Sequence, residues 1–235
     1  MDNRYTRNIL IENFGEEGQQ KLKQSKVLVV GAGGLGSPVL FYLAAAGVGT
    51  LGIIDYDVID VSNLQRQILH RTSDLGKNKI ESAKEKLTAL NPEVKINTYG
   101  FKFTTDNATD VIKEYDFVID CCDNYATKFL INDICVKEQK PYSHGAVLAL
   151  RGEVMTYIPG CADYRAVFDN PPEEGTAPSS AQVGILGAIA GVIGSIQATE
   201  AIKYLTGIGD LILNRILIFD GKIMKFSELK VRLMR

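Results

Sequence analysis

The chain has 235 residues, 46% of them hydrophobic, and a formal net charge of −2. This length is enough for one large α/β domain with a substantial core, and the small net charge gives no general basic field for nucleic acid. The four cysteines form no C-x-x-C pair with the spacing of a zinc site. Few cysteines and the lack of a signal peptide predict a reducing, cytoplasmic setting.

The first 25 residues carry two arginines, Arg4 and Arg7, before a mixed helical pattern over Glu16–Lys23. Two arginines near an N-terminus usually belong to a solvated arm. The next segment of the chain predicts a nucleotide site, so an arm that reaches phosphates is the alternative. Both interpretations are open at this point.

The pattern over Val27–Val30, Ser37–Ala46 and Leu51–Ile54 predicts a strand, a helix of small residues and a second strand that ends at Asp55. A glycine cluster joins the first strand to the helix. Glycines in such a turn let backbone N–H groups approach an anion, and the helix that follows adds the positive end of its dipole. The glycines are Gly31, Gly33, Gly34 and Gly36.

Asp55 stands at the tip of the second strand, where a carboxylate can accept hydrogen bonds from both ribose hydroxyls. Gly31, Gly33 and Gly36 satisfy G-x-G-x-x-G, with an acid about 20 residues on, as dinucleotide dehydrogenases do. The stretch therefore predicts a nucleotide site and leaves NAD and ATP equally open. Glycines that serve only helix–strand packing are the disfavoured alternative, because the whole strand–turn–helix–strand context is present.

The polar segment Asp57–His70 follows the second strand at the carboxyl edge, where α/β sheets bind ligands. Asn63 and Arg66 can both point at phosphate there, and arginine suits this role through its permanent charge and forked donors. The alternative is an N-capped helix that starts at Ser62 and leaves Arg66 exposed. Both can hold together.

An amphipathic helix is predicted over Gly76–Leu90, and Asn91 and Pro92 stop it. Most of its lysines are expected to be solvated. Lys79 stands near the start of the helix, close to the sheet edge, and is the lysine that we single out as a candidate ligand.

A strand is predicted over Val94–Tyr99, a helix over Asn107–Glu114 and a further strand over Asp116–Asp120. Asp123 follows this last strand and is a natural Mg²⁺ ligand, because magnesium prefers one or two carboxylates with phosphate oxygens. Alternatively, Asp123 caps the helix that begins near Ala126. That helix is predicted over residues 125–137, with Cys135 as a small core residue.

The second half of the chain predicts antiparallel strands. The tight spacing of Pro141–Ala149 and Gly152–Ile158 indicates a hairpin. Asp220-Gly221 marks a second hairpin between Arg215–Phe219 and Lys222–Ser227. Residues 160–183 form a long loop that is expected to be functional or mobile. Gly184–Ile196 is a buried helix, too short to span a bilayer, and no membrane role is expected.

In this order the motifs resemble the ThiF/MoeB/HesA family, bacterial relatives of the ubiquitin-activating enzymes. The resemblance covers nearly the whole chain, from RYTRNILIENFGEEGQQKL through GAGGLGSPVLFYLAAAGVG, SNLQRQILH, KIESAKEKLTALNP and DFVIDCCDN to GILGAIAGVIGSIQATEAIKYLTG. It implies a Rossmann-like α/β fold in which a parallel sheet continues into antiparallel strands. It also implies one adenylation domain, with an N-terminal arm and helix (1–25), a nucleotide-binding half (26–140) and a carrier-binding half (141–235) whose loop 160–183 is mobile.

The resemblance decides for ATP. The family adenylates the C-terminal carboxylate of a small ubiquitin-like carrier, usually one that ends in Gly-Gly, and releases pyrophosphate. It implies that Arg7 reaches into the active site of the partner subunit, which makes the enzyme a homodimer. The other implied roles are nucleotide binding by Gly31, Gly33 and Gly34, ribose binding by Asp55, triphosphate binding by Asn63, Arg66 and Lys79, Mg²⁺ binding by Asp123 and support of the site by Asn124.

The sequence departs from the family at two cysteine positions. Asp163–Ala166 reads DYRA where C-Y-R-C is expected, and Cys161 stands alone, so we predict no zinc. Ser180 replaces the cysteine of A-P-S-C-A-x-x-G, and a serine hydroxyl supplies no ready thiolate. Cys121 and Cys122 are interpreted as core thiols beside the site.

Other functions remain open on the sequence. A related enzyme that adenylates a peptide or a small-molecule carboxylate has the same motifs, because partner choice lies in loop 160–183 and in surface shape. An NAD-dependent oxidoreductase is disfavoured, because no His–Asp or Tyr–Lys pair with suitable context is present for hydride transfer. The pathway that receives the acyl-adenylate (thiamine, molybdopterin, cysteine or another) is also open.

Overall fold

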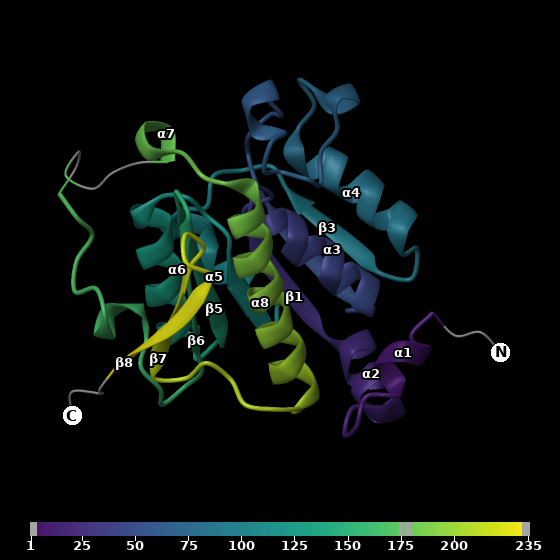
Figure 1. Cartoon of the computed structure of the whole chain (residues 1–235). Helices are drawn as coiled ribbons and strands as arrows, with labels where there is room; N and C mark the ends of the chain where they lie inside the picture. Colours follow the sequence, from purple (N-terminus) through teal and green to yellow (C-terminus); the bar gives the residue numbers. More distant parts are fainter. Residues whose placement is uncertain (1–3, 174–175, 177–179, 232–235) are drawn as a thin grey trace.

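The computed structural model describes residues 4–173, 176 and 180–231, with only the backbone of Ser180 and Ala181. One eight-stranded sheet runs through it in the order β3-β2-β1-β4-β5-β6-β7-β8 (Figure 1). Neighbouring strands pair in parallel from β3 to β5 and antiparallel from β5 to β8, which confirms the predicted change of direction. The strands are β1 Lys26–Val30, β2 Thr50–Ile54, β3 Lys95–Tyr99, β4 Phe117–Asp120, β5 Tyr142–Leu148, β6 Arg151–Tyr157, β7 Arg215–Asp220 and β8 Lys225–Lys230.

Helices cover both faces of the parallel half, so that its central strands are buried on both sides and read as continuous apolar runs. On one face, α3, α4 and α8 pack on alternate residues of β1 and β2, and on the other face α5 and α6 pack on the remaining ones (Figure 1). The helices are α1 Thr6–Ile9, α2 Gly15–Gln24, α3 Gly36–Ala46, α4 Lys79–Leu90, α5 Thr105–Lys113, α6 Tyr125–Lys137, α7 Ser180–Val183 and α8 Gly187–Thr206, with short 3-10 turns η1 Val61–Asn63, η2 Thr72–Asp74 and η3 Tyr164–Ala166.

Two helices begin later than their patterns predict. Helix α4 begins at Lys79 rather than Gly76, because Gly76 has a φ of +81° that does not fit a right-handed helix. Helix α8 begins at Gly187 rather than Gly184, which likewise has a positive φ of +82°. The glycines of α8 do allow close packing, since a Cβ on Gly194 would lie 2.6 Å from the carbonyl oxygen of Leu35.

The expected long loop is partly ordered by the core. Tyr164 is buried, and its backbone N–H donates to Asn132 Oδ1 at 2.8 Å. Strand β8 also begins later than predicted, at Lys225, because the turn after Asp220 extends over Gly221–Met224. Within the described residues, no helix has both the length and the apolar character needed to cross a bilayer.

Candidate functional site

The glycine turn after β1 lies between the ends of β2 and β4. Gly31 N donates to Ile54 O at 2.8 Å, and a Cβ on Gly31 would lie 2.7 Å from Cys121 O, which explains why this position requires glycine. The described part of the chain provides no hydrogen-bond acceptor for the N–H groups of Gly33 and Gly34. They stand just before α3 and are available to an anion.

Asp55 ties the end of β2 to this turn. Its Oδ2 accepts from the Ala32 N–H at 2.8 Å, and its Oδ1 accepts from the Asp57 N–H at 2.9 Å. Burial raises the pKa of Asp55, and the nearby Lys79 ammonium counteracts part of that shift. The carboxylate thus already supports the turn, in addition to the ribose contact predicted for it.

Lys79 is the first residue of α4, and its side chain lies between two carboxylates. Its Nζ is 2.7 Å from Asp57 Oδ2 and 3.9 Å from Asp55 Oδ1, with the side chain 7% exposed. The fold therefore places this lysine close to the sheet edge, as predicted. Asp57 was not among the predicted site residues, although the alternation Asp-Tyr-Asp at the end of a strand was a usable signal.

The side chain of Arg66 lies along the glycine turn. Its Cγ would be 3.5 Å from a Cβ on Gly34, and its Nη1 donates to Ser62 O at 2.9 Å. The alternative, an N-capped helix from Ser62 with Arg66 exposed, holds in part: a capped 3-10 turn begins one residue earlier, at Val61, but Arg66 is half-buried. Asp60 is the N-cap of the 3-10 turn: its Oδ1 accepts from Ser62 N at 2.8 Å, and Asn63 Oδ1 accepts from Asp60 N at 3.2 Å.

Asp123 and Asn124 follow β4, whose carboxyl end lies beside that of β1. The capping alternative for Asp123 is wrong, because Asn124 is the N-cap of α6 and its Oδ1 accepts from Thr127 N at 2.9 Å. Asp123 is exposed, and its carboxylate has no hydrogen bond or ion pair within the described residues. A free carboxylate at this edge fits the preference of Mg²⁺ for one or two carboxylates together with phosphate oxygens.

A buried polar group that the sequence analysis missed lies directly beneath this segment. We call Asp120, Lys128 and His144 the strand cluster. Asp120 Oδ2 is 3.1 Å from Lys128 Nζ and 2.8 Å from His144 Nδ1. Burial alone would raise the pKa of Asp120, but the Lys128 ammonium and the hydrogen bond from His144 hold it well below its usual range.

The thiols near the site are protonated. Cys121 is buried as predicted, whereas Cys122 is partly exposed and its Sγ lies 2.6 Å from Asp120 Oδ1. Burial raises the pKa of both thiols. Cys135 is fully buried, which confirms its interpretation as a core residue. The side chain of Ser180 lies outside the described residues.

A second buried polar group lies beneath the glycine turn, and the sequence analysis missed it too. We call His70, Asp74, Ser82 and Lys86 the turn cluster. His70 Nε2 is 3.0 Å from Ala32 O and His70 Nδ1 is 2.9 Å from Ser82 Oγ. Lys86, expected to be solvated, is buried and donates to Ser82 Oγ at 2.7 Å and to Asp74.

The structure thus brings most predicted site residues to one edge of the parallel sheet. Arg7 is not among them: it lies on α1, which packs on α2 near the amino end of β1 (Figure 1). Asn8 beside it donates to Gln19 Oε1 at 3.3 Å, and Gln19 Nε2 donates to Ala46 O at 2.8 Å. Arg7 is exposed and makes no ion pair with any described residue.

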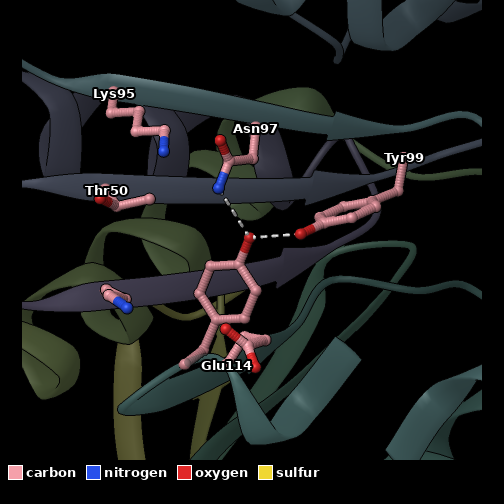
Figure 2. Close-up of a pocket in the computed structure, with 7 residues that line it drawn as sticks. Thr50, Lys95, Asn97, Tyr99 and Glu114 are labelled. Atoms are coloured by element: carbon pink, nitrogen blue, oxygen red, sulfur yellow. Dashed lines mark hydrogen bonds between the residues drawn. The ribbon is translucent and has the colours of Figure 1, made fainter. Parts of the chain in front are cut away.

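A cavity of about 150 Å³ lies elsewhere, on the α5 side of the sheet (Figure 2). The Tyr115 ring packs directly on Gly52 of β2. A Cβ at Gly52 would lie only 2.3 Å from the Tyr115 hydroxyl, so this position requires glycine. That hydroxyl is 2.9 Å from Tyr99 Oη and 3.4 Å from Asn97 Nδ2. No predicted site residue lines this cavity, which is lined by Lys26, Thr50, Lys95, Asn97, Tyr99, Glu114 and Tyr115.

No metal-binding cluster of three or more His, Cys, Asp or Glu side chains was found among the described residues. At the position where the family pattern has C-Y-R-C, Asp163 instead caps η3, and its Oδ1 accepts from Ala166 N at 2.9 Å.

Comparisons with known proteins agree with this architecture. The ThiF family model matches residues 5–235. A Mycobacterium tuberculosis protein named probable adenylyltransferase/sulfurtransferase MoeZ is 42% identical over 234 residues, which cover 97% of this chain and 60% of that protein. The Culex quinquefasciatus adenylyltransferase and sulfurtransferase MOCS3 is 45% identical over 230 residues, which cover 97% of this chain and 52% of that protein. The chain thus spans little more than half the length of these two relatives.

Solved structures share the fold. The crystal structure of Escherichia coli MccB with ATP has a TM-score of 0.88 at 24% identity, covering 98% of this chain and 71% of that one. The structure of PaaA has a TM-score of 0.82 at 26% identity, covering 97% of this chain and 72% of that one.

Proposed function

This chain belongs to the ThiF family, and we propose that it transfers the adenylyl group of ATP to the C-terminal carboxylate of a small ubiquitin-like sulfur-carrier protein, releasing pyrophosphate. The names of its relatives, which are adenylyltransferases, support the reaction class. One observation carries the proposal. The N–H groups of Gly33 and Gly34, which have no acceptor among the described residues, share a sheet edge with Asp55, Arg66 and Lys79.

The residue types fit the chemistry of this reaction. A carboxylate attacks the α-phosphorus, so the nucleophile is already an anion and needs no general base. The obstacle is the repulsion between two anions and the charge that develops on the leaving pyrophosphate. Arg66, Lys79 and the backbone donors of the turn are fixed positive groups that lower this cost electrostatically. Holding both reactants in place lowers the barrier further.

Asp123 is the residue that would hold Mg²⁺ at this edge, since its carboxylate is exposed and free of other described side chains. Bound with phosphate oxygens, the ion would supply neutralising charge. Asn124 supports the same position from behind, because its side chain caps α6 and fixes where Asp123 stands.

Arg7 suits a role in the site of a second subunit, which makes the proposed enzyme a homodimer. The arginine is exposed on α1, at the opposite end of the sheet from the candidate site of its own chain. A groove of about 340 Å³ runs beside α1, between α3 and α8. Tyr42 lines this groove and is 57% exposed, as expected for a residue that a second copy covers.

The antiparallel half suits the binding of the carrier. Four large apolar side chains on the last hairpin are exposed. They are Ile223, Met224, Phe226 and Leu229. A folded carrier protein needs an apolar surface of this kind to bind, whereas a free small-molecule carboxylate does not.

The test is ATP–pyrophosphate exchange with a panel of carriers that end in Gly-Gly, each with and without the terminal glycines. Asp123→Ala and Arg66→Ala should each abolish exchange while the far-ultraviolet circular dichroism is retained. Asp110→Ala, which removes an exposed carboxylate on α5, is the matched control and should exchange normally. Near-normal exchange in both site variants would refute the assignment.

The same assay separates the other functions. Exchange that depends on a peptide or a small carboxylate, and not on any carrier, would assign a related activator. Binding of NAD without binding of ATP would assign the chain to the oxidoreductase alternative and end the present proposal.

A further inference from the structure

Ala32, at the start of the glycine turn, is held from both sides by side chains. Its N–H donates to Asp55 Oδ2 at 2.8 Å, and its carbonyl oxygen is 3.0 Å from His70 Nε2. Asp55 directly follows β2 and His70 ends the polar segment after it, so two separate parts of the chain meet at one residue. Asp55 was predicted as a ribose ligand at this site, whereas His70 was not among the predicted site residues.

The direction of each hydrogen bond around His70 follows from the groups present. A carbonyl oxygen can only accept, so Nε2 of His70 carries the proton and donates to Ala32 O. Burial lowers the pKa of His70, which keeps the ring neutral, and Nδ1 is then the acceptor for the Ser82 hydroxyl.

Lys86 is the first donor of this hydrogen-bond chain, because its ammonium donates to Ser82 Oγ at 2.7 Å and to Asp74. Asp74 Oδ2 also lies 3.2 Å from Ser82 Oγ, but the hydroxyl has one proton, which goes to His70 Nδ1 because that nitrogen carries none of its own. Asp74 accepts from Lys86 instead, so the donors point from Lys86 through Ser82 and His70 to the turn. His70 and Ser82 are 5% and 0% exposed. Solvent does not compete with these bonds, so they hold the ring in one orientation.

The planarity of the peptide bond transfers this orientation to the phosphate-binding side of the turn. In a trans peptide, the C=O of one residue and the N–H of the next point in opposite directions. No cis peptide bond occurs in the described chain. Because the Ala32 carbonyl points inward to His70, the Gly33 N–H points outward, and it is one of the unpartnered donors of the site.

We infer that His70 is a positioning residue for phosphate binding: by holding the Ala32 carbonyl, it fixes the Ala32–Gly33 peptide so that the Gly33 N–H faces the phosphates of a bound nucleotide. This inference rests on the proposed function, because it presumes that ATP occupies the turn. It assigns no chemical step to His70. Its effect is on the affinity for phosphate groups, and the adenosine part of the nucleotide is outside its reach.

The experiment compares ATP with adenosine, which lacks the phosphates. Dissociation constants for both are measured by calorimetry on the native chain, on His70→Phe and on His70→Gln. Phenylalanine keeps a planar ring without a donor, and glutamine offers an amide that can donate to the same carbonyl. We expect His70→Phe to weaken ATP binding about tenfold, because the Gly33 N–H is then no longer held toward the phosphates. Loss of one hydrogen bond to a charged group has an effect of about this size. Adenosine should bind unchanged, and His70→Gln should recover most of the loss.

Ser82→Ala is the second variant, in case His70→Phe does not fold. It removes the hydroxyl that fixes the tautomer of His70, and it should weaken ATP several-fold and leave adenosine unchanged. Thr88→Ala is its matched control, because it deletes a hydroxyl from the exposed side of the same helix. Thermal melts of each variant confirm the folded state.

The outcomes separate the two claims. Native ATP affinity in folded His70→Phe and Ser82→Ala would overturn the positioning role and leave the proposed function standing. A parallel loss of ATP and adenosine would also overturn it, because general damage to the fold produces that pattern. If the native chain binds no ATP, the proposed function fails first, and the inference falls with it.

Discussion

The turn cluster and the strand cluster are built from the same residue types and serve neighbouring parts of one edge. Each contains a buried aspartate, lysine and histidine. In the strand cluster, Asp120 accepts directly from both Lys128 and His144. In the turn cluster, Ser82 stands between His70 and the Asp74–Lys86 pair, and the imidazole faces a backbone carbonyl.

The difference shows two ways to support a site from below. The strand cluster balances charge at the end of β4, and its carboxylate also accepts from Cys122 N at 3.1 Å, which ties down the segment that leads to Asp123. The turn cluster keeps its charge pair away from the turn and passes only a neutral donor to it. The His70 ring beneath the turn stays neutral, so the turn offers an anion its backbone N–H donors without an added positive charge.

The largest effect is expected from a substitution that breaks the strand cluster. Asp120→Asn is nearly isosteric, so it opens no cavity, but it leaves the buried Lys128 ammonium without its carboxylate partner. The free energy of unfolding should fall by about 3–5 kcal/mol, the typical cost of an uncompensated buried charge. Urea unfolding measures it, with Asp110→Asn on the exposed side of α5 as the control. A loss below about 1 kcal/mol would contradict the charge-balancing role.

A smaller effect is expected from the same kind of change in the turn cluster. Lys86→Met removes the buried ammonium, but Asp74 still accepts from Arg71 N at 2.8 Å and lies 3.4 Å from the half-exposed Lys77 Nζ. Urea unfolding should show a loss of about 2 kcal/mol. The exposed Lys84 lies on the same helix, and Lys84→Met should change little. A loss equal to that of Asp120→Asn would mean that the remaining partners of Asp74 do not compensate.

A third comparison uses the helices that carry the two clusters. Helix α6 begins after Asn124, whose side chain caps it, whereas α4 begins after Asn78, whose side chain makes no cap hydrogen bond. Asn124→Ala should therefore cost about 1 kcal/mol of unfolding free energy and Asn78→Ala close to nothing. Equal costs would show that the two asparagines play the same local role after all.

The smallest effect concerns pH. Burial and the charges of Lys86 and Lys79 lower the pKa of His70, against the opposing influence of Asp74 and the Ala32 carbonyl. Because the pKa is lower in the folded chain than in the unfolded one, near 6.5, this contribution is full above about pH 6.5 and is lost as the pH falls below it. Stability should decrease from pH 7 to pH 5, and less so in His70→Gln. Identical pH profiles in urea unfolding would show that His70 is not the titrating group.

Local pattern was enough for the scaffold of the site. Continuous apolar runs followed by glycine or acid predicted β1, β2 and β4 correctly, because strands buried on both faces leave that signal. Chain order then placed the glycine turn, Asp55 and Asp123 at one edge. Helix starts were less accurate, since the positive φ of Gly76 and Gly184 is a property of the folded backbone that composition does not reveal.

The buried polar residues that support the site left no such signal in the sequence. Helical periodicity predicts which face of α4 is apolar, but it does not indicate how deeply a polar residue beside that face is buried. Most lysines of this helix were therefore expected in solvent, whereas Lys86 is buried. His70 acts on Ala32 from 38 residues away. Asp57 meets Lys79 across a segment that folds back on itself.

The amino-acid sequence by itself determined the order of strands and helices, the glycine turn and the acidic residues at the strand ends, because these depend on periodicity and on residues close together in the chain. The tertiary structure alone decided which polar side chains are buried and what they hold. Pairings such as His70 with Ala32 and Asp120 with Lys128 form only when packed elements bring distant backbone and side-chain groups within about 3 Å, where removal from water makes each bond specific.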